Sequence, residues 1–97
     1  MGCMEHYAYI VRCSDDSFYC GYTNNLENRI KTHNRGKGAK YTRARLPVVL
    51  VYFEKFDSKE EAMSREWHLK RLSHADKEAL AKGFTVPVPG EQIYQKS

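Results

Sequence analysis

YAYIVRCSDDSFYCGY, residues 7–22, places two short runs of aromatic and β-branched residues on either side of an acidic turn. Aromatic and β-branched residues favour strands, whereas Asp and Ser favour tight turns. The stretch therefore predicts a β-hairpin with strands at residues 7–13 and 18–23. It carries four tyrosines, and ordinary packing on a sheet is the simplest explanation for them.

A helix and a third strand are predicted after the hairpin. Asn24 or Asn25 can cap a helix in which Leu26, Ile30 and His33 recur at helical spacing, and the glycines of NRGKG end it. The sequence KGAKYTRARLP then predicts a loop. The nearly continuous apolar run VVLVYFEKF, residues 48–56, predicts a buried central strand.

Two more helices complete the predicted order of elements. Ser58 and Glu61 form a capping box ahead of a helix at residues 59–70, and Ser73 caps a second helix that Gly83 closes. Residues 83–97 contain two prolines and no clear period, which predicts a tail that is locally packed or disordered. The expected fold class is α+β, in the order β-β-α-β-α-α, within one domain at residues 1–82.

Length and composition limit the class of protein. A chain of 97 residues buries one modest core, which predicts one domain and one site. It has no apolar run long enough to span a bilayer and no signal-peptide pattern, so a cytoplasmic protein without membrane contact is expected. Its three cysteines, Cys3, Cys13 and Cys20, lack metal-ligand spacing, so they are predicted to be reduced, and a zinc site is not expected.

Positive charge is concentrated in one part of the chain. Residues 29–45 contain seven basic residues and no acidic one, although the whole chain carries a net charge of only +4. The remainder holds nine basic and twelve acidic residues. A block of one sign beside Gly36 and Gly38 predicts a mobile loop that contacts phosphates. A loop that only improves solubility is the alternative.

Several residues along these elements form a series that resembles a known family. YAY at residues 7–9 and YCG at residues 19–21 are followed by NLENRIKTH and SREWHLK. The series resembles the GIY-YIG nucleases, in particular small stand-alone bacterial members that share the segment GKGAKYTRxRxP, and the likeness covers residues 7–82. The resemblance rests on the order and spacing of six residues: Tyr9, Tyr19, Gly21, Arg29, His33 and Glu66.

This resemblance implies both a fold and an activity. The implied fold is a three-stranded antiparallel sheet flanked by helices. The implied activity is metal-dependent cleavage of phosphodiesters, with the active site on one face of the sheet.

Glu66 holds the place of the family's metal ligand. A carboxylate is a hard oxygen donor, suited to Mg²⁺ or Mn²⁺ whose other positions are filled by water and phosphate oxygens. One carboxylate predicts one divalent cation. Without the resemblance, Glu66 would be interpreted as a surface residue paired with Lys70, four positions later on the same helix.

The other residues of the series have predicted roles at the same site. Arg29 offers a permanently charged planar fork for phosphate oxygens, with a structural salt bridge as the alternative. His33 lies four residues later on the same helical face, where it would bind phosphate, move a proton or simply be packed. Tyr9 and Tyr19 are alternatives for the general base and for a group that orients water. Gly21 lets backbone or substrate approach closely.

The two tyrosines can act together only in one register of the hairpin. A two-residue loop would place Tyr9 and Tyr19 on opposite faces of the sheet. A three-residue loop with a bulge, in which Asp16 takes the left-handed conformation, pairs residue 9 with residue 21 and puts both tyrosines on one face. We expect this second register.

Nucleic-acid contacts are predicted mainly from the basic segment. Its side chains combine positive charge with an aromatic ring and a hydroxyl, suited to phosphate contacts with one stacking partner and little sequence specificity. The predicted contacts are Arg35, Lys37, Lys40, Tyr41, Thr42, Arg43, Arg45 and Lys70. Trp67, which points away from Glu66 around the helix, is expected to pack in the core.

The chain departs from the family pattern in three places. YAY stands where the family has Gly-Ile-Tyr, and Cys20 replaces Ile, changes that affect packing more than chemistry. Many family nucleases also carry a polar residue, often Asn, after the metal glutamate, but no Asn follows Asn34 in this chain. The candidates to replace it are Lys70, Ser73 and His74.

The sequence as a whole predicts a metal-dependent endonuclease that acts on DNA in preference to RNA. Damaged, branched or single-stranded forms, as in DNA repair, are the expected substrates. Because the chain has no second domain to choose the substrate, two alternatives are expected: weak, unselective cleavage by the chain alone, or a protein partner that supplies selectivity. The alternatives are a non-catalytic nucleic-acid-binding module with the same fold and, from a third class, a protein-interaction adaptor.

Overall fold

The sheet and its helices follow the predicted order in the computed structural model, which describes residues 5–83. Its strands are β1 (His6–Arg12), β2 (Phe18–Thr23) and β3 (Val49–Phe56). Its helices are α1 (Leu26–Asn34), α2 (Lys40–Arg43), α3 (Lys59–Lys70) and α4 (His74–Lys82). The strands form one antiparallel sheet in the order β2-β1-β3, which confirms the predicted α+β class. Residues 84–97 of the predicted tail lie outside the described residues.

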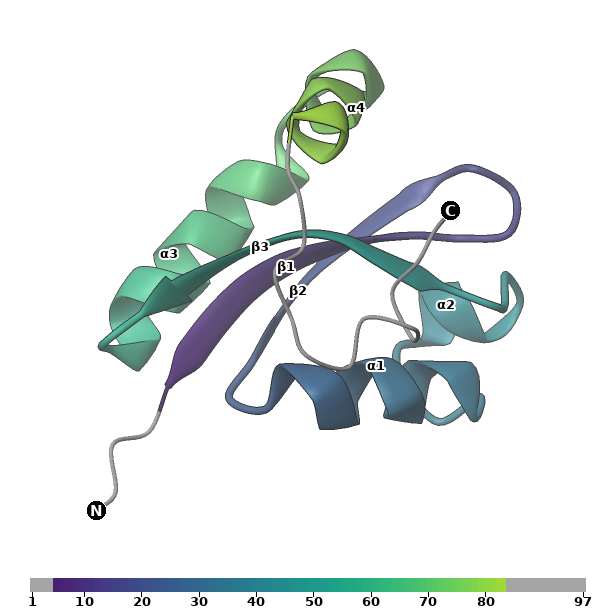
Figure 1. Cartoon of the computed structure of the whole chain (residues 1–97), viewed down its shortest axis with the longest axis horizontal. Coiled ribbons are helices and arrows are strands. Elements are labelled where there is room, and N and C mark those ends of the chain that lie inside the picture. Colours follow the sequence, from purple (N-terminus) through teal and green to yellow (C-terminus); the bar gives the residue numbers. More distant parts are fainter. Residues whose placement is uncertain (1–4, 84–97) are drawn as a thin grey trace.

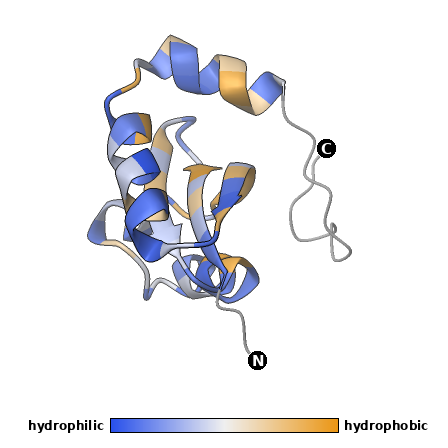
Figure 2. Cartoon of the chain, turned by 90° about the vertical axis from the view of Figure 1, so that its left-hand side faces the viewer, coloured by the Kyte–Doolittle hydropathy of each residue, from blue (hydrophilic) through white to orange (hydrophobic). Residues whose placement is uncertain are grey.

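Helices cover both faces of the sheet, with α1 and α2 on one side and α3 and α4 on the other (Figure 1). On the α1 side, Tyr9 and Val11 of β1 pack in one buried cluster with Leu26 and Ile30. On the α3 side, a second cluster is built from Ala8, Ile10, Phe18, Cys20 and Leu69. Figure 2 shows hydrophobic residues along the strands between the two helical layers. Alternation along the strands thus supplies two separate cores.

The central strand is β1, so the prediction of a central strand at residues 48–56 is wrong. β3 is an edge strand, and most of its side chains are only half-buried. Because helices cover both faces of the sheet, an edge strand also needs apolar residues on both of its faces. The continuous apolar run therefore indicates that both faces of this strand are covered. It does not indicate a central position in the sheet.

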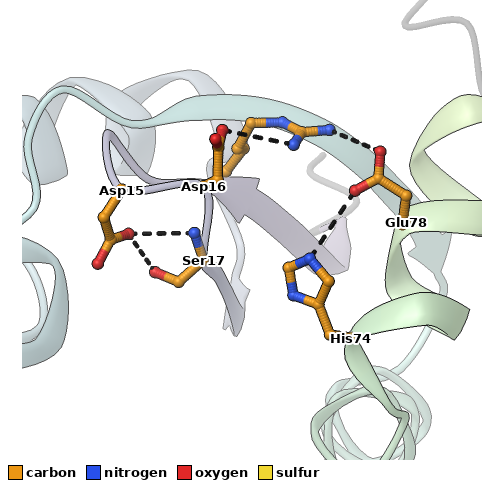
Figure 3. Close-up of polar contacts among 6 residues, drawn as sticks. Asp15, Asp16, Ser17, His74 and Glu78 are labelled. Atoms are coloured by element: carbon orange, nitrogen blue, oxygen red, sulfur yellow. Dashed lines mark hydrogen bonds and ion pairs between the residues drawn. The ribbon is translucent and has the colours of Figure 1, made fainter.

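The hairpin has the predicted register. Tyr9 pairs with Gly21 and Val11 pairs with Tyr19, so both tyrosines point toward the α1 side. Asp16 has a φ of 68°, in the left-handed region that Asp tolerates. The amide of Ser17 donates to Oδ1 of Asp15 at 3.0 Å, an Asx-type bond that fixes the turn (Figure 3).

Predicted capping residues begin three of the helices. The side chains of Asn25, Ser58 and Ser73 each accept a hydrogen bond from the backbone amide three residues later. The segment predicted as a loop contains the short helix α2, a correction to the prediction. Its first turn places Thr42 in the interior, fully buried.

Polar contacts hold α4 against the hairpin. Arg12 lies between Asp16 and Glu78, with nitrogen–oxygen distances of 3.8 Å and 3.5 Å (Figure 3). The ring of His74 lies over Phe18, the first residue of β2, at 4.8 Å between centroids. These contacts join α4 to the end of β1 and to the start of β2.

Trp67 is exposed, so the prediction that it packs in the core is wrong. Its exposed fraction is 56 %, and the guanidinium of Arg71 lies 4.6 Å from the ring centroid. Ala62 and Leu69 are the buried residues of α3. Trp67 is two residues from Leu69, about 200° around the helix, so burial of Leu69 turns Trp67 outward.

The described part of the chain has no helix with the length and hydrophobicity needed to cross a bilayer. Cys13 and Cys20 are buried free thiols, as predicted. Within residues 5–83, no three His, Cys, Asp or Glu side chains gather into a metal-binding cluster.

Candidate active site

A chain of hydrogen bonds links the two elements that carry Tyr9 and His33. Oη of Tyr9 lies 2.9 Å from Nε2 of His33, and Nδ1 of the same ring lies 2.9 Å from Oγ1 of Thr42. The Thr42 hydroxyl donates its proton to the carbonyl oxygen of Ala39 at 2.9 Å. Thr42 must therefore accept from Nδ1–H, which leaves Nε2 of neutral His33 to accept from the Tyr9 hydroxyl.

Two glycines make room for these rings. A Cβ on Gly21 would lie 2.5 Å from Oη of Tyr9, so the phenol can cross β2 only where a side chain is missing. A Cβ on Gly38 would overlap with Nδ1 of His33. The close approach predicted for Gly21 is therefore an approach by Tyr9 itself.

Both buried groups are neutral near pH 7. Burial raises the pKa of Tyr9 to about 12, although the hydrogen bond and charge of Arg29 act in the opposite direction. Burial, with the charge of Arg29, lowers the pKa of His33 to about 4. The phenol thus keeps its proton and donates it to His33, and both side chains are fully buried. This arrangement fixes the positions of the Tyr9 and His33 rings, and it does not by itself provide a deprotonated base.

Arg29 lies beside both tyrosines. Its Nε donates to Oη of Tyr9 at 3.3 Å. Partial burial disfavours the charged guanidinium, but the interactions with Tyr9 and Tyr19 outweigh burial and raise the pKa of Arg29. Arg29 is half-buried, so the prediction of a charged fork at this position agrees with its surroundings.

Tyr19 is the more accessible of the two tyrosines. Its ring meets the edge of His33 at 5.5 Å and stacks on Tyr41 of α2 at 6.1 Å. The guanidinium of Arg45 lies 3.9 Å from the Tyr41 centroid and also bonds to Asp15 at 3.1 Å. Tyr41 and Arg45 thus tie the basic segment to the hairpin and are already engaged within the protein.

Glu66 reaches the same region from the other side of the sheet. It lies on α3, and its charge contributes to the raised pKa of Tyr9. Oε2 of Glu66 lies 3.2 Å from Nζ of Lys70, and the Glu66 side chain is 18 % exposed. Helices α1 and α3, which carry Arg29 and Glu66, lie on opposite faces of the sheet (Figure 1), and the charge of Glu66 still acts on Tyr9.

A divalent cation fits these residues only if water and substrate supply most of its ligands. Glu66 offers one partly exposed carboxylate, and no cluster of three potential ligands surrounds it within residues 5–83. Mg²⁺ often keeps several waters and takes phosphate oxygens beside one or two carboxylates. The geometry fits a cation held by Glu66, water and substrate.

One predicted nucleic-acid contact must be corrected. Thr42 is fully buried and bonds to His33 and Ala39, so it holds the histidine and is not placed to contact phosphate. Four other predicted side chains are exposed near the α1–α2 segment: Arg35, Lys37, Lys40 and Arg43.

Of the three candidates to replace the family's Asn, Lys70 alone contacts Glu66. Ser73 accepts the amide of Asp76 as the cap of α4, and His74 lies next to Glu78. Gly38 and the supporting role of Thr42 were missed. The sequence shows only a glycine and a threonine within the basic segment. Neither residue by itself indicates that it contacts His33.

Comparison with known families agrees with this geometry. The family described as "GIY-YIG catalytic domain" is matched by residues 5–79, which include every member of the series from Tyr9 to Glu66.

Several curated proteins are similar to the chain. A UPF0213 protein from Bacillus licheniformis is 62 % identical over 74 residues, which cover 76 % of this chain and 76 % of the relative. A UPF0213 protein from Clostridium perfringens is 52 % identical over 91 residues, covering 94 % of this chain and 95 % of the relative. The solution NMR structure of a UPF0213 protein from Bacillus halodurans is 51 % identical, with a TM-score of 0.54, and the match covers 87 % of this chain and 89 % of that one.

Proposed function

The chain belongs to the GIY-YIG catalytic-domain family, and on that basis we propose that it is a divalent-metal-dependent endonuclease that hydrolyses phosphodiester bonds in DNA. The observation that carries the proposal is that Arg29 interacts with both Tyr9 and Tyr19 while the charge of Glu66 acts on Tyr9. These side chains come from different elements, and Tyr19, Arg29 and Glu66 each supply a different part of the chemistry that phosphodiester hydrolysis requires.

Arg29 binds the scissile phosphate. Tyr9 accepts the Nε–H of Arg29, which orients the guanidinium and leaves its terminal nitrogens for Tyr19 and for phosphate oxygens. Positive charge held in place before the reaction stabilises the charge that grows on the phosphoryl oxygens in the transition state. Tyr9 and His33 are positioning residues in this account.

Glu66 would hold the divalent cation, with water and phosphate oxygens as its other ligands. A bound Mg²⁺ or Mn²⁺ supplies Lewis-acid stabilisation of the phosphate and lowers the pKa of water. Lys70 neutralises Glu66 in the cation-free protein, since its ammonium lies 3.2 Å from Oε2. If Glu66 bound a cation, the Lys70 ammonium would be free to contact the substrate.

Tyr19 orients the attacking water. Of the two signature tyrosines, Tyr9 is fully buried and donates its proton to His33, whereas Tyr19 is only half-buried. The Tyr19 hydroxyl is therefore the phenol that a water near Glu66 and Arg29 can reach.

The exposed basic side chains of the α1–α2 segment provide sequence-independent affinity for the backbone.

The proposal is tested by cleavage of labelled single-stranded, duplex, flapped and branched DNA, with matching RNA, in Mg²⁺, Mn²⁺ or EDTA. The expected result is cleavage of DNA that depends on the cation and falls at least 100-fold in Tyr19→Phe, because a positioned group in phosphoryl transfer contributes on the order of 100-fold or more. Cleavage that persists in EDTA would contradict the proposal.

A second candidate function is a nucleic-acid-binding module without activity. The ion pair between Glu66 and Lys70 favours it, because a carboxylate that is already neutralised needs no metal. Oligonucleotide binding by the wild-type protein, without cleavage of any substrate in either cation, would establish this second function.

A further inference from the structure

A groove of about 260 Å³ lies beside the candidate active site, between β2 and the helices α2, α3 and α4. It is lined by Phe18, Tyr19, Cys20, Tyr41, Lys70 and Lys77. Two of these residues also belong to the edge of the active site, since Tyr19 contacts the ring of His33 and Lys70 pairs with Glu66. A ligand bound across Glu66 and Arg29 can therefore continue directly into the groove.

The charged residues of the groove are both lysines. No acidic residue lines it, and Lys77 has no acidic partner within residues 5–83. Both ammonium groups lie near the Cys20 thiol, because each acts to lower its pKa, although burial prevails and raises that pKa. Within residues 5–83, Lys77 is thus the unpaired positive charge of the groove, with the ammonium of Lys70 held nearby by Glu66, and such a charge favours an anion.

The position of Lys77 is fixed by the packing of α4. The adjacent Glu78 pairs with Arg12 of β1 at 3.5 Å, and Leu80 packs against the cluster that contains Phe18 and Leu69. The helix that carries Lys77 is thus held against the hairpin by a polar and an apolar contact, and Figure 3 shows the polar contact of Glu78.

The aromatic side chains of the groove already contact other side chains of the protein. One face of Tyr41 is covered by Arg45 at 3.9 Å, and Tyr19 stacks on the ring at 6.1 Å between centroids. Tyr41 is 39 % exposed but its ring already contacts Arg45 and Tyr19, whereas a phosphate finds the ammonium of Lys77 with Lys70 nearby. The chemistry of the groove favours the backbone of a nucleic acid over its bases.

We propose that this groove binds the phosphates of the nucleic-acid strand next to the cleaved bond, with Lys77 and Lys70 as the contacts. The inference rests on the proposed nuclease function and extends it, because it makes α4 a part of the substrate-binding surface. The contacts are with phosphate, so they add affinity without sequence specificity.

The test measures binding of a fluorescently labelled oligonucleotide of mixed sequence in EDTA, at salt concentrations from about 50 to 200 mM. Lys77→Gln is compared with wild type, with Lys77→Arg and with Lys59→Gln. Lys59 begins α3, is exposed and lies about 16 Å along the helix axis from Lys70, so its substitution removes the same charge away from the groove. Thermal unfolding followed by circular dichroism shows whether each variant remains folded.

Lys77→Gln should weaken binding by about five- to eightfold at 0.1 M salt and lower the slope of log affinity against log salt by about 0.7–0.9, the effect of one lost phosphate contact. Lys77→Arg should bind like wild type, and Lys59→Gln should keep the wild-type slope. Equal binding by Lys77→Gln and Lys59→Gln would overturn the inference, as would the absence of oligonucleotide binding by the wild type.

Cleavage by the wild-type protein, measured in parallel, separates the two proposals. If cleavage depends on the cation but binding does not depend on Lys77, the proposed phosphate binding by the groove is overturned and the proposed nuclease function stands. Binding that depends on Lys77 without any cleavage would support the groove and overturn the nuclease function.

Discussion

Tyr9 and His33, two of the largest side chains in the site, are placed where they are by glycines. Tyr9 crosses β2 over Gly21, and His33 lies against Gly38. A hydroxyl and a guanidinium then hold the two rings, since Thr42 bonds to His33 and Arg29 bonds to Tyr9. The fixed positions of Arg29 and Tyr19 depend on these supports.

Gly21→Ala should destabilise the protein and disturb the site. The new methyl group would lie 2.5 Å from Oη and 2.6 Å from Cζ of Tyr9, a ring that is fully buried and cannot move without breaking its hydrogen bonds. We expect the free energy of unfolding to fall by about 1–3 kcal/mol, as overpacking of a core typically costs. Urea denaturation followed by circular dichroism measures it.

Gly83→Ala is the matched control for that substitution. Gly83 ends α4 with a φ of −87°, and a Cβ there would lie 3.5 Å from its nearest neighbour, the Ala79 carbonyl oxygen. The control should therefore unfold like wild type. If the two variants were equally stable, the close approach of Tyr9 to Gly21 would be wrong.

His33 should make stability depend on pH in mild acid. Burial lowers its pKa from 6.5 to about 4, so between these values the unfolded chain binds a proton that the folded protein does not. The free energy of unfolding should therefore be highest above pH 6.5 and fall by up to about 3 kcal/mol as the pH drops to about 4.

His33→Gln removes this titration, so its stability should change less over the same range. Urea denaturation of both proteins from pH 4 to pH 7 isolates the difference, because all other titrating groups are shared. Parallel curves for the two proteins would show that His33 titrates normally.

The sequence predicted the register of the tyrosines but not the support of His33. Register depends on local turn chemistry, and Asp16 tolerates the left-handed conformation that the three-residue loop requires. The bond from His33 to Thr42 joins residues on different helices, and its formation depends on how α2 packs. A basic block beside glycines suggested phosphate contact for Thr42, whereas tertiary packing buried it.

At the level of elements, the two faces of α3 should respond very differently to truncation. Trp67→Ala should lower the free energy of unfolding by less than about 1 kcal/mol, because the ring is 56 % exposed. Leu69→Ala should lower it by about 2–5 kcal/mol, because Leu69 is fully buried against the sheet.

Urea denaturation followed by circular dichroism compares these two variants, since Trp67 is the one tryptophan of the chain and its fluorescence is lost in the first. A cost for Trp67→Ala as large as that for Leu69→Ala would contradict the orientation of α3.

Helix starts and the hairpin turn were predictable from the sequence because they depend on residues that are close together in the chain. Asn25, Ser58 and Ser73 each begin a helix as predicted. The order of strands was not predictable from an apolar run, because β3 is apolar on both faces although it lies at an edge. Helix α2 was missed because it has four residues and no side-chain cap.

At the scale of the whole molecule, the open edge of β2 is where the two sides of the sheet meet. Arg29 comes from α1 on one side, and Glu66 and Lys70 come from α3 on the other. The sequence predicted these residues through a resemblance, and the family match at residues 5–79 confirms it. Their placement on opposite faces depends on how α1 and α3 pack against the sheet, which no local pattern in the sequence indicates.

The central claim is that Glu66 serves catalysis and not merely an ion pair with Lys70. The most direct measurement compares single-turnover cleavage and oligonucleotide binding for wild type and Glu66→Gln in Mn²⁺. We expect Glu66→Gln to lose cleavage by at least about 100-fold while it still binds the oligonucleotide, because Arg29 and the exposed basic side chains are retained. Cleavage by Glu66→Gln at the wild-type rate would contradict the account.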